Sequence, residues 1–326
     1  MIARDAREAI GRALAAAGLA PADPGLRPTG VPGQYASSVA LDRPRAAEAL
    51  AATLAAEPWI AVAEVTGPGY LTVTATPEAL AALPERIAMA GPAVAASDAL
   101  RDVTVPAPPT ADPLAADSWE EAREELAAQL TARLAAVAGA TVAMGPGGEA
   151  AVRSGEEGAV PGATEVAAAV AFAGADAVRF SLARAVPGRA VRIDAGVIAR
   201  HVPDNPAYAV RYAHARAASG VRWAAIPTAA EAAPPRPPAD PGELALLDAL
   251  SWLPERVAVA ARRGRPDEFA RYLEELASVS IAALTSGGHQ GRARAPGTDK
   301  PALAWAAQAG LAAGLELLGV SAPERL

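Results

Sequence analysis

The chain has 326 residues, a length that accommodates two or three domains. It contains 29 Lys and Arg against 36 Asp and Glu, and the net charge of −7 argues against a protein coated with nucleic acid. Cysteine is absent, which excludes disulfides and thiolate metal sites, and three scattered histidines disfavour a zinc site. The opening segment is charged and amphipathic, unlike a signal peptide, and no apolar run suits a membrane span. We therefore expect a cytoplasmic protein without metal or cofactor.

The charge is unevenly distributed along the chain. Residues 1–199 carry 15 basic and 23 acidic side chains, whereas residues 200–326 carry 14 and 13. A local group of arginines can neutralise a few phosphates even when the whole chain is acidic. The C-terminal part contains two such groups: Arg211, Arg216 and Arg222, then Arg262, Arg263 and Arg265.

The N-terminal part alternates helical and strand patterns. Helical spacing covers residues 3–19 and 44–57. Residues 60–75 alternate around a Gly-Pro-Gly break, which predicts two strands joined by a tight turn. A further helix begins with Thr76 as its cap. Residues 1–95 are therefore predicted to form an α+β domain.

The middle of the chain begins with a change of composition. Residues 96–117 are rich in proline and aperiodic, which indicates a linker. A helix capped by Ser118, a short strand at 141–145 and a helical stretch broken near Gly174 follow. We interpret residues 118–200 as a small α/β segment.

Residues 201–326 have the pattern of a helical bundle. Asn205 and Pro206 suit the start of a helix that continues to residue 224. A Pro-rich stretch with PxxP spacings follows at 226–242, and its composition favours a loop over a ligand for an SH3 domain. Three more helical patterns complete the chain, over 243–263, 266–284 and 301–318.

The helix after Asn205 has two distinct faces. Helical spacing puts one set of side chains in the core: Ala207, Val210, His214, Ala217 and Val221. Tyr208, Tyr212, Arg216 and Ser219 fall on a neighbouring face. That second face is either a solvated shoulder or a surface that meets a flat, anionic partner.

Three C-terminal motifs resemble the anticodon-binding domain of arginyl-tRNA synthetases, an all-α bundle. They are NPAYAVRYAHAR at 205–216, RYLEELA at 271–277 and LELLGVSAPERL at 315–326. Two positions depart from the family pattern, with Arg211 in place of Gln and Leu326 in place of Met. Three matches in order are far more specific than any one of them.

Two N-terminal motifs agree with this resemblance. GQYASSVAL at 33–41 and VTGPGYLTV at 65–73 are similar to segments of the additional N-terminal domain of those synthetases. GADAVRFSLAR at 174–184 resembles the segment that closes their catalytic domain. The resemblance implies that residues 118–200 are a degenerate remnant of the catalytic domain and that residues 201–326 are the anticodon-binding domain.

The motifs that support catalysis in that family are missing from this sequence. None of the three histidines stands in a His-x-Gly-His motif, which in the family stabilises the phosphates of ATP. The second phosphate-stabilising loop needs lysine or arginine, but the corresponding region reads RSGEEGAV, at 153–160. Its two acids would repel a triphosphate, and the only lysine is Lys300. The resemblance therefore implies a relative that has lost arginine–tRNA ligase activity.

The resemblance also implies where tRNA would be held by the C-terminal domain. The positions of Tyr212 and Leu326 lie against the anticodon loop in the family, and a tyrosine can stack on a base there. The alternative for Tyr212 is packing between helices, and His214 is expected to be a hydrogen-bonded core histidine. Arg211 and Arg222 are expected to be exposed and to contact phosphates, whereas Arg216 suits a structural ion pair equally well.

The N-terminal domain of the family reads the D-loop of tRNA, and the matched segments are altered here. Four residues are candidates for this contact: Tyr35, Ser38, Tyr70 and Thr72. Ser38 and Thr72 stand where the family has asparagine, and Ala36 stands where it has glutamine. The aromatic rings remain while the amides that could pair with bases are lost, so weaker and less specific contact is expected. The alternative is that both tyrosines serve only the fold.

Three hypotheses about function follow. The first is a non-catalytic tRNA-binding protein, with arginine-accepting tRNA as a candidate ligand. The second is a protein-interaction or regulatory module that kept the synthetase fold and binds a protein partner in place of RNA. The third is a divergent arginine–tRNA ligase with a nucleotide site in residues 118–200, although this segment has no Gly-rich phosphate loop. Neither a membrane nor DNA is an expected partner.

Overall fold

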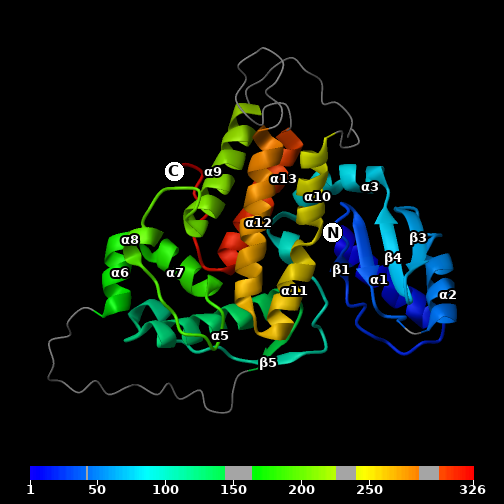
Figure 1. The fold of residues 1–326 in the computed structure, drawn as a ribbon, viewed down its shortest axis with the longest axis horizontal. Helices are drawn as coiled ribbons and strands as arrows, with labels where there is room; N and C mark the ends of the chain where they lie inside the picture. The colour runs from blue at the N-terminus through cyan, green and yellow to red at the C-terminus, as the bar shows by residue number, and fades with distance from the viewer. Residues whose placement is uncertain (42, 144–163, 225–239, 286–300) are drawn as a thin grey trace. The chain divides into compact units, whose positions relative to one another are not determined.

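A computed structural model describes residues 1–41, 43–143, 164–224, 240–285 and 301–326 (Figure 1). The chain divides into two compact units. The first unit contains residues 1–94, 217–254 and 279–310, and the second contains residues 95–216, 255–278 and 311–326. Each unit combines parts of several predicted domains, so the domain boundaries at residues 95, 117 and 200 stay predictions. No helix in the described part of the chain is long and apolar enough to cross a bilayer.

The first unit contains a four-stranded antiparallel sheet with helices packed on it (Figure 1). The strand order is β1-β2-β4-β3. The elements are α1 (Ile2–Ala16), β1 (Arg27–Pro28), β2 (Gln34–Ser37), α2 (Pro44–Leu54), β3 (Ile60–Thr66) and β4 (Tyr70–Ala75). Ile10 of α1, Leu50 of α2 and Leu71 of β4 are fully buried together in its core. This arrangement confirms the α+β pattern.

The turn between β3 and β4 forms where the sequence predicts it. Gly67 and Gly69 have φ of 55° and 117°, which other residues rarely adopt. Thr66 and Tyr70 are therefore paired across the turn. Next come α3 (Pro77–Ala81) and α4 (Leu83–Ala90), and the Thr76 side chain accepts a hydrogen bond from the Ala79 amide at 3.1 Å. The predicted cap is thus confirmed.

The predicted helix over 243–263 is wrong in one respect, because two helices occupy this segment. They are α10 (Pro241–Ser251) and α11 (Leu253–Arg263), with Trp252 between them. Pro254 has no amide hydrogen to donate to the preceding turn, so the helix cannot continue unbroken. Asp240 caps α10 by accepting from the Glu243 amide at 2.8 Å.

The second unit begins with a parallel strand pair. After η1 (Gly91–Ala95), which closes the N-terminal segment of the first unit, come β5 (Thr104–Pro106), η2 (Pro113–Ala115), α5 (Trp119–Val137) and β6 (Thr141–Ala143). β5 and β6 run parallel because α5 forms the crossover between them. The Pro-rich segment expected to be a linker thus contains a strand and a short helix, and Leu114 within it is buried. Its prolines obscure the strand pattern.

The remaining helices are α6 (Glu165–Ala173), α7 (Ala175–Arg184), α8 (Ala195–Ile198), α9 (Pro206–Ala224), α12 (Pro266–Thr285) and α13 (Pro301–Leu317). Gly174, with φ of 87°, separates α6 from α7 as predicted. The expected phosphate-loop region at 153–160, Lys300, and all but the last three residues of the Pro-rich loop at 226–242 lie outside the described residues.

Candidate nucleic-acid interface

Helix α9 has the two faces that its sequence predicts. Ala207, Val210, His214 and Ala217 are buried, and Val221 is half-buried. On the neighbouring face Tyr208, Arg216 and Ser219 are half-buried, whereas Tyr212 has 36% of its surface exposed. Tyr212 therefore lies at the surface with part of its ring open to a ligand.

Three aromatic rings stack along this face of α9. The rings of Tyr208 and Tyr212, one helical turn apart, have centroids 5.7 Å apart and planes inclined by 19°. The imidazole of His201 stacks on Tyr208 at 5.3 Å and 11°. We call these three residues the aromatic column. Tyr208 lies between the other two rings and is half-buried, whereas Tyr212 and His201 at the two ends are exposed.

His201 was not among the residues predicted for this site. It precedes the helix, so helical spacing cannot place it beside Tyr208. The loop that carries it is held by Asn205, whose side-chain amide donates to the carbonyl oxygens of Ile198 and Arg200, both at 2.7 Å. Asn205 thus fixes the loop that positions His201 at the start of α9.

The C-terminal tail, residues 320–326, is attached to α9 and α7. Gly319 ends α13 with φ of 68°, a conformation that suits glycine at this position after a helix. Beyond it, the Ser321 amide donates to Asp176 of α7 at 3.1 Å, and the Ser321 hydroxyl donates to the same carboxylate. Arg211 of α9 donates to the Ser321 hydroxyl at 3.3 Å and lies 3.4 Å from Asp176.

These contacts correct the expectation for Arg211. Its side chain is only 26% exposed and is paired with Asp176. Its contacts with a carboxylate of α7 and a serine of the tail hold the Arg211 side chain against the tail. Arg211 is therefore less exposed than the sequence predicts, and its contact with phosphates stays a prediction.

His214 holds the tail one helical turn further along α9. Its Nδ1 lies 2.9 Å from the carbonyl oxygen of Pro323. Since a carbonyl only accepts, Nδ1 carries the proton in this bond. Burial lowers the pKa of His214 below its ordinary value of 6.5, opposed by this bond and by Glu324. The prediction of a hydrogen-bonded core histidine is confirmed.

Tyr212 and Leu326 are both exposed, whereas the part of the tail that precedes Leu326 is anchored through Ser321 and Pro323. Leu326 is 57% exposed. It follows Pro323 by three residues, so it lies within about 10 Å of that anchor. Arg216 is half-buried on the same helix. Arg222, expected to be exposed, is also half-buried and lies in the part of α9 that belongs to the first unit.

The N-terminal candidates for tRNA contact are less accessible than the sequence suggests. Tyr35 is fully buried, and its hydroxyl forms a 2.8 Å hydrogen bond with Ser251 of α10. Its ring packs against Trp252 at 5.1 Å, and burial raises the pKa of its phenol above the ordinary range. Thr72 is buried as well, with its hydroxyl 2.9 Å from that of Thr66.

A fully buried ring cannot stack on a base, so the structure corrects the expectation for Tyr35 and supports its role in the fold. Gly33, two residues earlier, donates its amide to Asp248 of α10 at 2.9 Å, so α10 covers this end of β2. Ser38 and Tyr70 are half-buried and remain the accessible candidates in this part of the first unit.

Comparison with known proteins identifies the class of domain that contains most of α9 and the C-terminal tail. Residues 210–326 match the DALR anticodon binding domain. The chain is also 38% identical over 155 residues to an arginine–tRNA ligase of Frankia alni, and 38% identical over 177 residues to one of Bifidobacterium longum. These alignments cover 44% of this chain and 28% and 27% of those enzymes.

A solved structure has a similar fold. The arginyl-tRNA synthetase of Thermus thermophilus superposes with a TM-score of 0.69 over the full length of both chains, at 17% sequence identity. The C-terminal part of this chain is therefore an anticodon-binding domain of the DALR type. The aligned part of the chain is similar to arginine–tRNA ligases, and the chain spans about a quarter of the length of the curated relatives it matches.

Proposed function

We propose that this chain is a non-catalytic tRNA-binding protein whose α9 surface and C-terminal tail hold the anticodon loop. The single observation that carries the proposal is the exposed ring of Tyr212 at one end of the aromatic column, beside a tail that Arg211 and His214 anchor. The match of residues 210–326 to an anticodon binding domain supports it. The relatives' description as arginine–tRNA ligases makes an arginine-accepting tRNA the first ligand to test.

Stacking would provide much of the binding energy at this surface. An unpaired base of a loop can lie on the open face of Tyr212, which is worth roughly 1–3 kcal/mol by alanine substitution. Tyr208 already covers the opposite face, so one base stacks there. Because the phenol oxygen is not needed for stacking, phenylalanine should replace Tyr212 with little loss.

Attraction between arginines and the phosphates of tRNA would add to stacking. Arg216 and Arg222 are the arginines of α9 that we assign to phosphates, in keeping with the near-neutral charge of residues 200–326. Arg211 acts in this proposal through the tail, which it holds with Asp176 and Ser321. With so few phosphates neutralised, the affinity should be modest at physiological salt.

The non-catalytic part of the proposal is supported by the sequence. His201, His214 and His289 are the three histidines, and none stands in a His-x-Gly-His motif. Without those side chains the phosphates of ATP lose a source of stabilisation during adenylate formation. Arginine-dependent pyrophosphate exchange above background would contradict this part and favour a divergent ligase.

A second candidate function is a regulatory module that binds a protein in the cytoplasm. The observation that favours it is the burial of Tyr35 and Thr72, two of the four residues predicted to contact tRNA from the N-terminal part. The acidic balance of residues 1–199 points the same way. This candidate predicts a partner for the first unit and no tRNA binding by the purified protein.

Titration of fluorescent tRNA against the purified protein, followed by anisotropy at two salt concentrations, separates these functions. We expect binding at low salt that weakens on Tyr212→Ala by roughly 1–3 kcal/mol, equivalent to about 5- to 150-fold, and changes little on Tyr212→Phe. Absence of binding at low salt would reject the RNA proposal and leave the regulatory one.

A further inference from the structure

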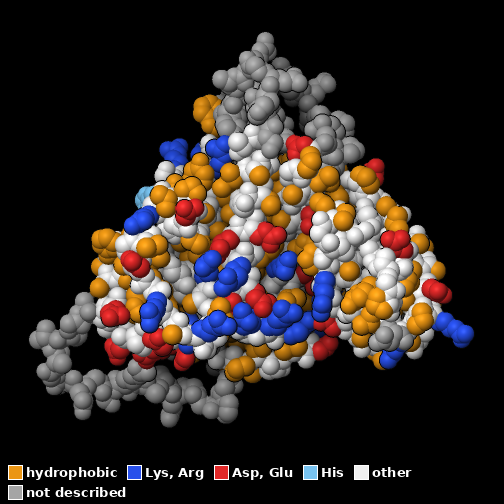
Figure 2. Space-filling model, viewed as in Figure 1, with side chains coloured by type: hydrophobic (Ala, Val, Ile, Leu, Met, Phe, Trp, Pro, Cys, Tyr) orange, Lys and Arg blue, Asp and Glu red, His pale blue; other side chains and the backbone are white. Residues whose placement is uncertain are grey.

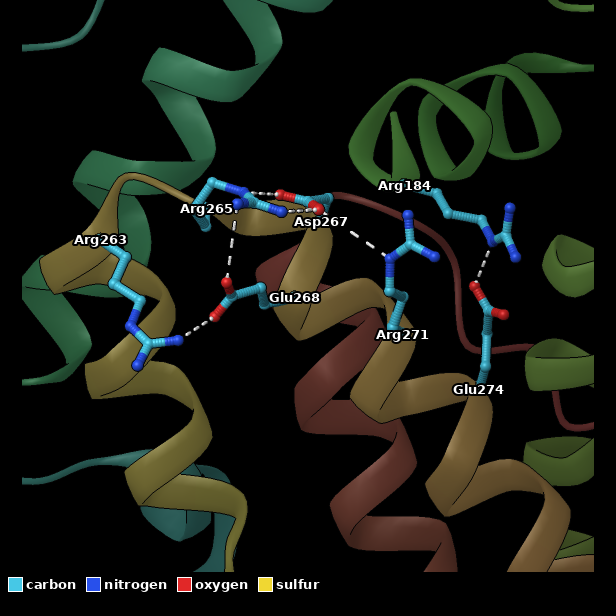
Figure 3. A network of polar contacts seen from close by, with 7 residues as sticks. All are labelled: Arg184, Arg263, Arg265, Asp267, Glu268, Arg271 and Glu274. Carbon is cyan, nitrogen blue, oxygen red and sulfur yellow. Dashed lines mark hydrogen bonds and ion pairs between the residues drawn. The ribbon is translucent and has the colours of Figure 1, made fainter. Parts of the chain in front are cut away.

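A group of arginines surrounds the corner between α11 and α12 in the second unit (Figure 3). Gly264 makes the corner with φ of 61°, and the Arg265 amide closes it by donating to the Ala260 carbonyl at 2.9 Å. We call the cationic side chains here the corner patch: Arg184 at the end of α7, Arg263, Arg265 and Arg271. Asp267, Glu268 and Glu274 are their acidic neighbours (Figure 3).

One of the three acids is internal to the structure. The side chain of Asp267 is 0% exposed, and Arg265 donates to both of its oxygens at 2.7 Å. Arg271 lies 3.9 Å from the same carboxylate. A bidentate pair of this kind balances the buried charge and fixes the first turn of α12. Asp267 therefore contributes little negative charge to the surface above it.

The outer arginines are more exposed than the acids that they contact. Arg263 is 60% exposed and donates one terminal nitrogen to Glu268, which is 32% exposed, at 3.1 Å. Arg184, 41% exposed, reaches Glu274 through Nε at 2.6 Å. A guanidinium has five N–H donors, so each of these contacts uses only a few of them and leaves most for a second ligand.

Because Asp267 is buried and the two glutamates are less exposed than the arginines, the exposed charge at this corner comes mainly from the corner patch. Asp267, Arg271 and Glu274 are spaced by four and three residues, so they share one face of the helix. Glu274 holds Arg184 beside that face. Figure 2 shows Lys and Arg side chains gathered over the corner of α11 and α12, with a few acidic side chains among them.

We infer that the corner patch is a second contact surface for tRNA, which binds the phosphate backbone without reading bases. This inference rests on the proposed function and extends it from α9 to α11 and α12. Guanidinium forks match phosphate oxygens, and exposed ion pairs with carboxylates contribute little, so a phosphate can replace Glu268 or Glu274 at small cost. The contact should therefore be independent of tRNA sequence and sensitive to salt.

The test compares two pairs of substitutions in the full chain. R263Q/R271Q removes two exposed charges and keeps the buried pair of Arg265 with Asp267. It should weaken binding of all tRNAs alike and lower the slope of log Kd against log salt by about two, because two fewer phosphates would be neutralised. E268Q/E274Q removes the competing carboxylates and should tighten binding, a result that a purely structural network would not give.

Arg12→Gln is the matched control, because Arg12 is also 60% exposed and paired with a carboxylate, Glu57, at 2.5 Å. It should leave the salt slope unchanged. An unchanged slope in R263Q/R271Q, with tRNA still bound through Tyr212, would overturn the inference and leave the proposed function standing. If the same variant stopped binding an acidic peptide but still bound tRNA normally, the patch would belong to a protein partner. No tRNA binding by the unaltered protein would overturn both.

Discussion

Arg211 and His214, one helical turn apart on α9, attach the C-terminal tail through two different kinds of bond. Arg211 forms an ion pair with Asp176 and a hydrogen bond with Ser321, whereas His214 forms a single hydrogen bond with the Pro323 carbonyl. Tyr212 stands between them in the sequence and is 36% exposed. The helix thus places two residues that hold the tail on either side of Tyr212, the residue that the family resemblance marks as an RNA contact.

The burial of His214 makes the tail sensitive to acid. Its pKa is lowered below 6.5 in the folded protein, so the unfolded chain takes up a proton first as the pH falls. Its contribution to stability is therefore present above about pH 6.5 and decreases as the pH falls from there toward its lowered pKa. The fall in melting temperature from pH 7.5 to pH 5.5 should be larger in the unaltered protein than in His214→Asn, whose side chain keeps a donor but cannot titrate. Equal losses in the two proteins would contradict this role.

Helices α12 and α13 pack closely at one glycine. A Cβ on Gly314 would lie 2.3 Å from Cδ2 of Leu273, whose side chain is fully buried and cannot move away freely. Gly314→Ala should therefore destabilise the protein by about 1–3 kcal/mol, as overpacking does. Gly11→Ala is the control, because its Cβ meets nothing within 4 Å and alanine favours a helix by about 0.5–1 kcal/mol. Urea unfolding should show a lower free energy of unfolding for Gly314→Ala and a higher one for Gly11→Ala. Equal destabilisation of the two variants would refute the packing argument.

The elements that the sequence predicts well are those with local causes. Thr76, Ser118 and Asp240 each accept a hydrogen bond from an amide two or three residues into the helix, so their helices start at recognisable residues, although Asp240 was not among the caps we predicted. β1, β2 and β5 are not predicted, because strands of two to four residues are too short to show a clear alternation. The break at Trp252 was missed although Pro254 marks it.

The candidate site was predictable to the extent that it lies on one helix. The two faces of α9 follow from spacing alone, and so does the burial of His214. The contacts of Arg211 with Ser321 and of Tyr35 with Ser251 join residues 110 and 216 positions apart, which no local pattern reveals. His201 belongs to the aromatic column because Asn205 fixes its loop, a tertiary effect that sequence spacing does not carry.

At the scale of the whole molecule, the chain combines an anticodon-binding domain with segments that are only partly shared with its relatives. The alignments cover 44% of the chain and about a quarter of the relatives' length. The two accessible surfaces that we assign to RNA, the aromatic column on α9 and the corner patch, are both in the second unit. The first unit contributes a sheet whose Tyr35 is buried against α10.

The most direct measurement of the central claim compares two pieces of an arginine-accepting tRNA. One is the isolated anticodon stem-loop, and the other is a minihelix of the acceptor and T arms. If α9 holds the anticodon loop, the stem-loop should bind nearly as tightly as the whole tRNA and should lose roughly 1–3 kcal/mol on Tyr212→Ala. Tighter binding of the minihelix, or binding of the stem-loop that ignores Tyr212→Ala, would contradict the account.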